Sequence, residues 1–443
     1  MKIAIVGTGI SGNLVARLLA GQHDVHLFEA AGHVGGHAHT QEIEAFGRQF
    51  TVDTGFMVCN DRTYPNFLRL LDVLQVPTRP SDMSFSVRCD RRGLEYQGSS
   101  WNGLFAQRAN LLRPSFYQML RDVWRFNRQA VALIDAADAE LALEEFLQMH
   151  KFSRSFTQHY LVPMAAAIWS ARADRLLEFP ATFIIRFFHN HGLLQIRDRP
   201  QWRTVVGGAK SYVEKLVAPL ADRIRLHCPV ATVQRHDQHV VVTTQRGEAE
   251  VFDQVVLATH ADQALKMLVD ADRCERETLQ AFPYQENEAV LHTDTSLLPR
   301  RRRAWASWNY HVPDDPSRPV AVTYDLSRLQ GLDSPSPICV TLNPARPLAP
   351  ARVLRRMTYH HPLFRRDSLA AQRRHAQISG RRRTHFCGAY WGNGFHEDGV
   401  NSALAVGKFF GKGWEACTAV FTKAGSDTVG SSRRITGSAT TSS

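Results

Sequence analysis

The fold is decided by the stretch IAIVGTGISG at residues 3–12. The four apolar residues predict a buried strand, the glycines predict a tight turn, and the apolar spacing through Leu14 and Leu18 predicts a helix. A G-x-G-x-x-G turn between a strand and a helix is the fingerprint of a dinucleotide site, where the turn and the helix N-terminus bind a pyrophosphate. We therefore predict that the phosphates are bound by Gly7, Gly9, Ser11 and Gly12.

A second predicted strand, VHLF at residues 25–28, ends at Glu29. An acidic residue at this point accepts hydrogen bonds from a ribose in dinucleotide-binding folds. The chain then continues into a glycine doublet, Gly35-Gly36, where an NAD site would continue into another helix. Near the other end stands a second glycine-rich segment, FCGAYWGNGFHEDGVNSA at residues 386–403. These features indicate a dinucleotide other than NAD.

Together these segments resemble the FAD-binding segments of the flavin amine oxidase and phytoene desaturase superfamily. More closely, the chain resembles a bacterial subgroup of FAD-dependent oxidoreductases often encoded beside cyclopropane fatty acid synthases, through VDTGF at 52–56, RTYPNF at 62–67 and HHP at 360–362. The similarity covers roughly residues 1–415. It implies FAD as cofactor and an α/β fold, in which a Rossmann-like FAD-binding domain of the glutathione-reductase type carries an interleaved α+β substrate domain.

The same resemblance and the pattern of elements predict the domain organisation. The FAD-binding domain is expected to comprise residues 1–80, 201–285 and the C-terminal motif at 381–415. The substrate domain is expected to consist of a mainly helical part, 81–200, and a sheet, 286–380. Residues 416–443 are rich in Gly, Ser and Thr and predict a disordered tail.

The resemblance also assigns residues to the cofactor. Gly35 and Gly36 match a motif near the phosphates that Thr40 closes, and His37 stands where the family often has arginine. The other implied cofactor contacts are Gly55, Phe56 and Met57 near the isoalloxazine, Val230 near adenine, and Gly388, Gly394, His396, Asp398 and Val400 in the C-terminal motif. His260 replaces the glycine of an A-T-G-like strand end. The helix beginning near Val400 is expected to point its positive end at the flavin N1/O2 side.

Members of the superfamily oxidise C–N or C–C bonds by hydride transfer to flavin N5. Amine oxidases orient the amine between two aromatic rings, and Tyr390 and Trp391 stand where the family often places one ring. Trp169, Trp308 and Tyr310 are candidates for the opposite wall. The alternative is that these aromatic residues only pack the core or the cavity. No lysine stands in a context that matches the flavin-adjacent lysine of amine oxidases.

The net charge of +11 comes with runs of arginine, of which Arg300–Arg303 is the longest. One reading is a solvated surface; the other is attraction to an anionic membrane, where each basic residue contributes about 1 kcal/mol. No nucleic-acid reader motif accompanies the charge. The seven cysteines are dispersed, which predicts a reducing compartment and neither a disulfide framework nor a metal site. Without an apolar run of about 18 residues, we expect a cytoplasmic protein, peripheral at the inner face of the membrane if the arginines bind lipid.

The leading hypothesis is an FAD-dependent oxidoreductase that dehydrogenates an apolar acyl chain of a modified fatty acid or phospholipid. The alternatives are a flavin-containing amine oxidase, a flavin-dependent isomerase without net redox change, and a non-catalytic FAD-bound partner of a lipid methyltransferase. No second G-x-G-x-x-G is present for NADPH. Electrons are therefore expected to pass to O2, a quinone or another protein.

Overall fold

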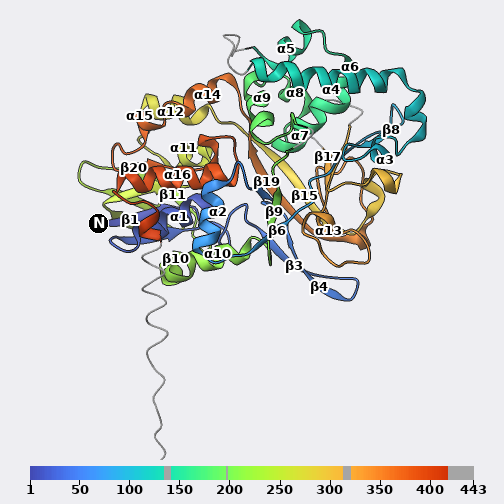
Figure 1. The fold of residues 1–443 in the computed structure, drawn as a ribbon. Coiled ribbons are helices and arrows are strands. Elements are labelled where there is room, and N and C mark those ends of the chain that lie inside the picture. Colours follow the sequence, from blue (N-terminus) through green and yellow to red (C-terminus); the bar gives the residue numbers. More distant parts are fainter. Residues whose placement is uncertain (134–140, 196–197, 313–320, 418–443) are drawn as a thin grey trace, which may run out of the picture.

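The computed structural model describes residues 1–133, 141–195, 198–312 and 321–417. The expected tail at 416–443 lies outside this range except for its first two residues. The chain is built around two sheets that lie side by side, with the N-terminal strands in one and most of the middle of the chain in the other (Figure 1). Across the described residues, no helix is both long enough and apolar enough to traverse a bilayer.

The first sheet contains five strands, and every pair of neighbours in it is parallel. In spatial order its strands are β10 (Ile224–Arg225), β2 (Asp24–Phe28), β1 (Lys2–Val6), β14 (Gln254–Leu257) and β20 (Thr384–Phe386). Three distant parts of the chain therefore form one sheet. Its central strands are apolar because parallel sheets are buried on both faces. The predicted α/β class with a Rossmann-like sheet is confirmed.

Helices and a smaller sheet cover this parallel sheet. Helix α1 (Ile10–Leu19) packs directly against α16 (His396–Phe409), so the N-terminal glycine turn and the C-terminal motif meet. The other elements on this side are α2 (Pro65–Val73), α10 (Lys210–Val217), α11 (Ala261–Met267), α12 (Arg273–Gln280), α14 (Arg366–Gln372), α15 (His375–Ile378) and the antiparallel sheet of β11 (Val230–Arg235), β12 (Val240–Thr244) and β13 (Ala249–Phe252).

The second large sheet has seven strands and is mostly antiparallel. Its order is β19 (Val353–Pro362), β15 (Tyr284–His292), β18 (Cys339–Leu342), β17 (Ala321–Asp325), β16 (Trp308–His311), β7 (Phe85–Cys89) and β8 (Leu94–Gln97). Strands β7 and β8 form where the alternating pattern between Phe85 and Tyr96 predicts strands, and β7 joins the sheet by parallel pairing with β16. The domain boundaries themselves stay a prediction.

A helical layer lies over this second sheet (Figure 1). It contains α3 (Trp101–Leu104), α4 (Pro114–Leu133), α5 (Leu143–Met149), α6 (Arg154–Phe156), α7 (Val162–Trp169), α8 (Ala173–Leu176) and α9 (Ala181–Asn190). Phenylalanines from these helices, such as Phe126, Phe156 and Phe188, are fully buried in one core with sheet residues. The helical layer therefore shares one hydrophobic core with the second sheet and is not a separate unit.

Asp53 joins the two halves of the molecule. Asp53 is the last residue of β4 (Arg48–Asp53), which pairs with β3 (Thr40–Ala45). The nearby three-stranded sheet consists of β5 (Cys59–Asn60), β9 (Trp202–Val205) and β6 (Thr78–Pro80). The buried carboxylate of Asp53 accepts the Thr40 hydroxyl at 2.5 Å, the Ala209 amide at 2.9 Å and the side-chain amide of Gln330, just past α13 (Leu326–Leu329). Burial raises the pKa of Asp53 to about 6.

We predict that Asp53→Ala lowers the free energy of unfolding by about 2 kcal/mol or more, because it leaves several buried donors without an acceptor. Asp333→Ala is the matched control, since Asp333 pairs with Arg48 on an exposed surface. Chemical denaturation of both variants measures the difference. Equal stability of the two variants would contradict the role of Asp53 as a junction.

Candidate functional site

A cavity of about 1510 Å³ runs between the two sheets. This exceeds the roughly 300–1,000 Å³ of ordinary ligand pockets and leaves room for a dinucleotide and a second molecule. One end, here called the dinucleotide arm, is lined by the turn after β1 and by Glu29 and Val230. The other end, the apolar arm, is lined by Met83, Phe85, Tyr96, Met119, Tyr160, Met164, Ile168, Trp308, Tyr324, Leu342 and Met357.

The N-terminal turn has the geometry that a phosphate needs. Gly7 has φ +100°, and a Cβ on Gly12 would lie 2.0 Å from the Gly7 carbonyl oxygen, so both positions require glycine. A Cβ on Gly9 would meet no protein atom within 4 Å and would project into free space. No side chain caps the N-terminus of α1 at Gly9. Its amides and helix dipole therefore remain available to an anion.

The glycine doublet closes on this turn. The Gly35 amide donates to the Thr8 carbonyl at 2.8 Å, and a Cβ on Gly36 would lie 3.1 Å from the Gly9 Cα atom. Gly36 also has φ +58°. The two turns touch through bare backbone, so a ligand on one also contacts the other.

Two of the predicted phosphate and ribose residues have partners within the protein. The Glu29 carboxylate lines the cavity and accepts the Thr8 amide at 2.9 Å, the Thr8 hydroxyl at 2.6 Å and the Ala31 amide at 2.8 Å. The Ser11 hydroxyl donates to the Gly399 carbonyl at 3.0 Å, which ties α1 to α16. Ser11 therefore offers the cavity its backbone, while its hydroxyl joins two helices.

Four predicted cofactor residues, Gly12, Thr40, Asp398 and Val400, do not line this cavity. Thr40 supports Asp53, as described above. Val400 is fully buried in the core between α1 and α16. Asp398 accepts the Asn393 amide at 3.0 Å and the Phe395 amide at 2.9 Å, so its carboxylate holds the loop before α16 in shape. A direct contact of these side chains with the cofactor is not supported by their positions.

The N-terminus of α16 faces the central part of the cavity. Gly388, Gly394 and His396 line it, and the His396 ring stacks on Phe56 at 3.6 Å between centroids. The Nε2 atom of His396 shares a hydrogen bond of 2.9 Å with the Tyr212 hydroxyl. Burial lowers the pKa of His396 to about 3, so its ring is neutral. Gly55 and Met57 line the cavity beside Phe56, as the sequence predicts.

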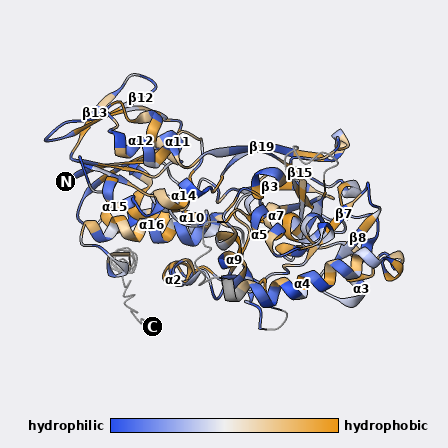
Figure 2. Cartoon of the chain, turned by 90° about the horizontal axis from the view of Figure 1, so that it is seen from above, coloured by the Kyte–Doolittle hydropathy of each residue, from blue (hydrophilic) through white to orange (hydrophobic). Residues whose placement is uncertain are grey.

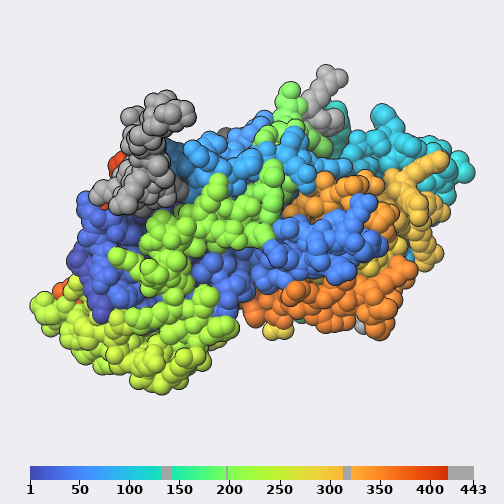
Figure 3. Space-filling model, turned by 90° about the horizontal axis from the view of Figure 1, so that it is seen from below, coloured from blue at the N-terminus to red at the C-terminus, as the bar shows by residue number. Residues whose placement is uncertain are grey.

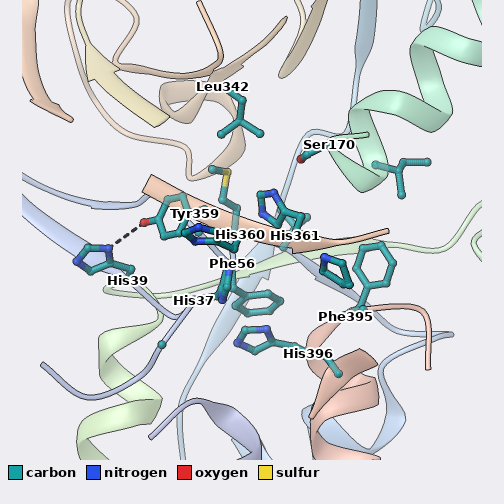
Figure 4. Close-up of a pocket in the computed structure, with 18 of the residues that line it drawn as sticks. His37, His39, Phe56, Ser170, Leu342, Tyr359, His360, His361, Phe395 and His396 are labelled. Carbon is teal, nitrogen blue, oxygen red and sulfur yellow. Dashed lines mark hydrogen bonds between the residues drawn. The ribbon is translucent and has the colours of Figure 1, made fainter. Parts of the chain in front are cut away.

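A group of histidines stands opposite α16 (Figure 4). His37 lies 5.4 Å from Tyr359, 5.6 Å from His361 and 5.9 Å from His260, between ring centroids. Burial lowers the pKa of His361 to about 3 and that of His260 to about 4, and repulsion among the rings adds to this effect. The Nε2 atom of His37 has no partner among the described residues. A polar group on a bound ligand fits this atom.

Neighbouring amides fix which nitrogens carry hydrogen. The Asn287 side-chain amide donates to Nδ1 of His361 at 2.9 Å, because its oxygen already accepts from Gln285 and Asn343. Neutral His361 therefore carries its hydrogen on Nε2. In the same way Gln41 donates to Nε2 of His39, whose Nδ1–H then bonds the Tyr359 hydroxyl at 2.8 Å (Figure 4).

Sequence reasoning missed Tyr359 and used the neighbouring pair His360-His361 as part of the family resemblance. His361 is half-buried in the cavity wall, while His360 is exposed and lies 3.6 Å from Glu286. The signal lay in the alternation of strand β19, whose successive side chains point to opposite faces of the sheet. No local motif marks which face of a strand borders a cavity.

The expected aromatic cage is only partly assembled. Tyr390 and Trp308 line the cavity, and neither the Tyr390 hydroxyl nor Trp308 Nε1 has a partner among the described residues. Trp391 packs on Tyr390 at 4.8 Å and is not part of the wall. Tyr310 is buried in the core, and Trp169 donates to the Asn393 carbonyl at 3.3 Å away from the cavity wall. One of the two rings expected on the first wall, Tyr390, and one of the three expected on the opposite wall, Trp308, therefore line the cavity.

In the described part of the chain, no three His, Cys, Asp or Glu side chains are grouped so as to hold a metal ion. The histidines of this group line the cavity as hydrogen-bonding side chains.

Residues 10–302 match the family of flavin containing amine oxidoreductases. The chain belongs to this family. A protein of Mycobacterium tuberculosis named as a flavin-containing monoamine oxidase, AofH, is 26% identical over 263 residues, which cover 56% of this chain and 55% of that protein. A tryptophan 2-monooxygenase of Allorhizobium ampelinum is 28% identical over 184 residues, covering 40% of this chain and 24% of that enzyme. The chain thus spans about half the length of AofH, the more extensively matched of these two relatives.

Solved structures share the fold. A fatty acid isomerase from P. acnes superposes with a TM-score of 0.67 at 18% identity, and putrescine oxidase bound to putrescine with a TM-score of 0.64 at 15% identity. Both similarities cover 92% of this chain and 98% of the other chain. These identities are low enough that they establish the architecture alone.

The family confirms the prediction of FAD as cofactor. The two touching glycine turns, the free N-terminus of α1 and the unpartnered His37 nitrogen fit such a group. We propose that these turns hold its phosphates, that Val230 borders its adenine, and that Phe56, Met57 and the N-terminus of α16 border its ring. These individual contacts stay predictions.

We predict that Gly9→Val yields a folded protein without bound flavin, because the new side chain enters the space left for the pyrophosphate. Gly98→Val is the matched control, since Gly98 lines the far arm and its Cβ would lie 4.0 Å from the Phe85 carbonyl oxygen. The visible absorbance of each purified protein, relative to its absorbance in the ultraviolet, measures flavin content. A Gly9→Val protein with full flavin would refute the binding arrangement.

We predict that the free energy of unfolding falls as the pH is lowered from about 6.5 to 4, because unfolded histidines bind protons there that His260, His361 and His396 do not. The slope is at most about 1.4 kcal/mol per pH unit for each histidine. His361→Gln should reduce the slope, whereas His236→Gln, in the exposed turn after β11, should not. Denaturation at a series of pH values tests this, and equal slopes for both variants would contradict it.

Proposed function

We propose that the chain is an FAD-dependent oxidoreductase that dehydrogenates an apolar acyl chain. The observation that carries the proposal is the chemistry of the apolar arm. Aliphatic and aromatic side chains from the second sheet and the helical layer line it, and Glu29 is the one carboxylate among the described residues of the whole cavity. Glu29 lies in the other arm and is already bonded to Thr8 and Ala31. A cationic amine thus finds no counter-charge in the apolar arm.

The shape of the apolar arm is adaptable. Four of the chain's eight methionines line this arm: Met83, Met119, Met164 and Met357. Methionine side chains are flexible and polarisable, so they fit irregular or variable apolar ligands. Arg199 adds an exposed cationic group to the lining. An amphiphile with an anionic head and a long apolar chain matches this combination.

When bound, FAD accepts a hydride from the substrate. The protein's contribution is to position the substrate and to control charge around the ring. The α16 N-terminus borders the cavity through His396, and the carboxylates of Glu397 and Asp398 in its first turn offset its partial positive charge. The neutral ring of His361 presents an N–H donor there, and the apolar walls exclude water. We propose catalytic roles for Tyr390 and Trp308 because both side chains line the cavity.

An amine substrate is the second candidate. The family and AofH are named for amine oxidation, and Tyr390 and Trp308 supply two rings to the cavity. The absence of a carboxylate among the described residues of the apolar arm makes the acyl chain the better match.

Two finer proposals come from the sequence. The first is a peripheral association with an anionic membrane surface, and the second is a partnership with a lipid-modifying methyltransferase. Resemblance to the subgroup encoded beside cyclopropane fatty acid synthases supports the second. Both are compatible with a substrate that resides in the bilayer.

We predict that detergent-dispersed membrane lipid bleaches the visible absorbance of the flavin under anaerobic conditions, whereas a panel of polyamines and monoamines does not. Met164→Arg should retain flavin and lose the bleaching, because it places a charge in the apolar arm. Met149→Arg, at an exposed position on α5, should behave as the unsubstituted protein. Bleaching by an amine would contradict the acyl-chain proposal and favour an amine substrate. If neither lipid nor amine bleached the flavin, a role as a non-catalytic partner would be favoured.

A further inference from the structure

An exposed apolar surface lies at the end of the molecule away from the N-terminus (Figures 1 and 2). It is formed by α3, the 3-10 helix of Arg108–Leu112 and the first half of α4. We call it the α3–α4 face and define it by its most exposed large side chains: Trp101 (77% exposed), Leu111 (48%), Leu112 (88%), Tyr117 (47%) and Trp124 (56%). Single exposed apolar residues are ordinary, but a group of them marks an interaction surface.

Ring contacts connect the members of this face. Phe105 lies 6.4 Å from Trp101 and 6.4 Å from Tyr117 between ring centroids. The Tyr117 hydroxyl donates to the Leu111 carbonyl at 3.1 Å. The Ser100 hydroxyl accepts the Gly103 amide and begins α3 directly beside the exposed indole of Trp101. The face is therefore one structured surface rather than a set of scattered side chains.

The charge around this face is mainly positive, and its one exposed carboxylate in the β7–β8 turn, Asp90, pairs with Arg88 and Arg300. Residues 96–121 contain no aspartate or glutamate but include Arg108, Arg113 and Arg121. Arg91 and Arg92 are exposed in the turn between β7 and β8, and the Arg113 guanidinium donates to the Gly93 carbonyl of the same turn at 2.8 Å. Arginines thus surround the apolar side chains.

The longest arginine run of the sequence borders the same face. The 3-10 helix of Arg302–Ala304 contacts α3 and β8, and Figure 3 shows the amber segment around residue 300 next to the teal segment around residue 100. Within this run Arg301 pairs with buried Glu95 at 3.0 Å, and Arg302 lies over the Trp305 ring.

The other arginine runs are engaged elsewhere in the protein. Arg356 pairs with Glu288, Arg366 with Glu145 at 3.0 Å, and Arg382 with Asp270 at 2.6 Å. Arg300 and Arg301 form comparable pairs with Asp90 and Glu95, so what distinguishes the α3–α4 face is that its arginines lie beside exposed tryptophan and leucine.

The apolar arm of the cavity reaches this face. Trp101 and Trp124 line the cavity and are also more than half exposed, and Leu104, Leu120 and Val123 line it just inside them. The same helices thus form the outer surface and the wall of the arm. A ligand that leaves the arm here meets apolar side chains first and arginines around them.

We propose that the α3–α4 face docks on an anionic lipid bilayer and that the apolar arm opens toward it. Leucine and tryptophan insert at the boundary of headgroups and acyl chains, and each arginine near an anionic surface adds about 1 kcal/mol of attraction. An acyl chain then enters the arm without crossing water. This proposal rests on the proposed function, because it deepens that function by naming how its substrate arrives.

The test measures sedimentation of the flavin-bound protein with vesicles of phosphatidylglycerol and phosphatidylcholine, and with vesicles of phosphatidylcholine alone. We expect binding to the anionic vesicles that weakens as salt is raised. Leu111→Ser combined with Leu112→Ser should reduce the partition coefficient at least about tenfold, because two leucines no longer enter the apolar layer. Val251→Ser combined with Val269→Ser is the matched control, since these residues are 54% and 55% exposed on the other half of the molecule.

Equal binding of the two double variants, or no binding of the unsubstituted protein to anionic vesicles, would overturn the proposal. So would a dimer in solution that Leu111→Ser with Leu112→Ser dissociates, because the face would then belong to a second copy of the chain. The vesicle test needs no turnover, whereas the bleaching test uses lipid dispersed in detergent. Vesicle binding without flavin bleaching would contradict the proposed function and leave the docking intact. Flavin bleaching without vesicle binding would contradict the docking and leave the proposed function intact.

Discussion

The structure depends on the contact between two glycine turns, one after β1 and one at the doublet of Gly35 and Gly36. Backbone meets backbone there: the Gly35 amide bonds the Thr8 carbonyl, and a Cβ on Gly36 would lie 3.1 Å from the Gly9 Cα atom. The third glycine, Gly12, lets α1 begin against the turn. Gly399 and Gly407 of α16 face Ile10 and Leu18 of α1, so the two helices pack closely, and the cavity lies along their N-terminal ends.

From this contact the cavity extends into a second, different environment. The dinucleotide arm is polar and built from turns of the parallel sheet, whereas the apolar arm is built from the face of the seven-stranded sheet and the helices above it. His260 and His361 stand at the boundary, and burial lowers the pKa of both rings so that they are neutral. Asp53 holds the two halves together where the hairpin, α10 and the end of α13 meet. The cavity is polar at its cofactor end and apolar at the end that reaches the α3–α4 face, where we propose that the protein docks on lipid.

The solved structures with this fold illustrate that a shared fold does not identify the substrate. Putrescine oxidase and a fatty acid isomerase superpose on this chain almost equally well, with TM-scores of 0.64 and 0.67. The cofactor half is common to such folds, and function is decided by the side chains around the second arm. In this protein that arm combines methionine, aromatic and aliphatic residues with an arginine. Its chemistry, more than its overall shape, separates the candidate substrates.

The sequence by itself determined the first strand, the glycine turn after it and the position of Glu29, and its resemblance to a flavoprotein superfamily indicated the FAD cofactor. The first three features are local, because a strand, a turn and a helix within thirty residues impose their own geometry on the backbone. Tertiary structure alone decided which aromatic rings reach the cavity, why Asp398 and Thr40 support loops instead of lining it, and that β7 and β8 join the second sheet. It also decided that His361 is half-buried while its neighbour His360 is exposed, and that the arginine run near residue 300 borders α3. Placements such as the pairing of β7 with β16 depend on contacts between residues far apart in the sequence, and a local pattern of residues carries no information about the partner it will meet.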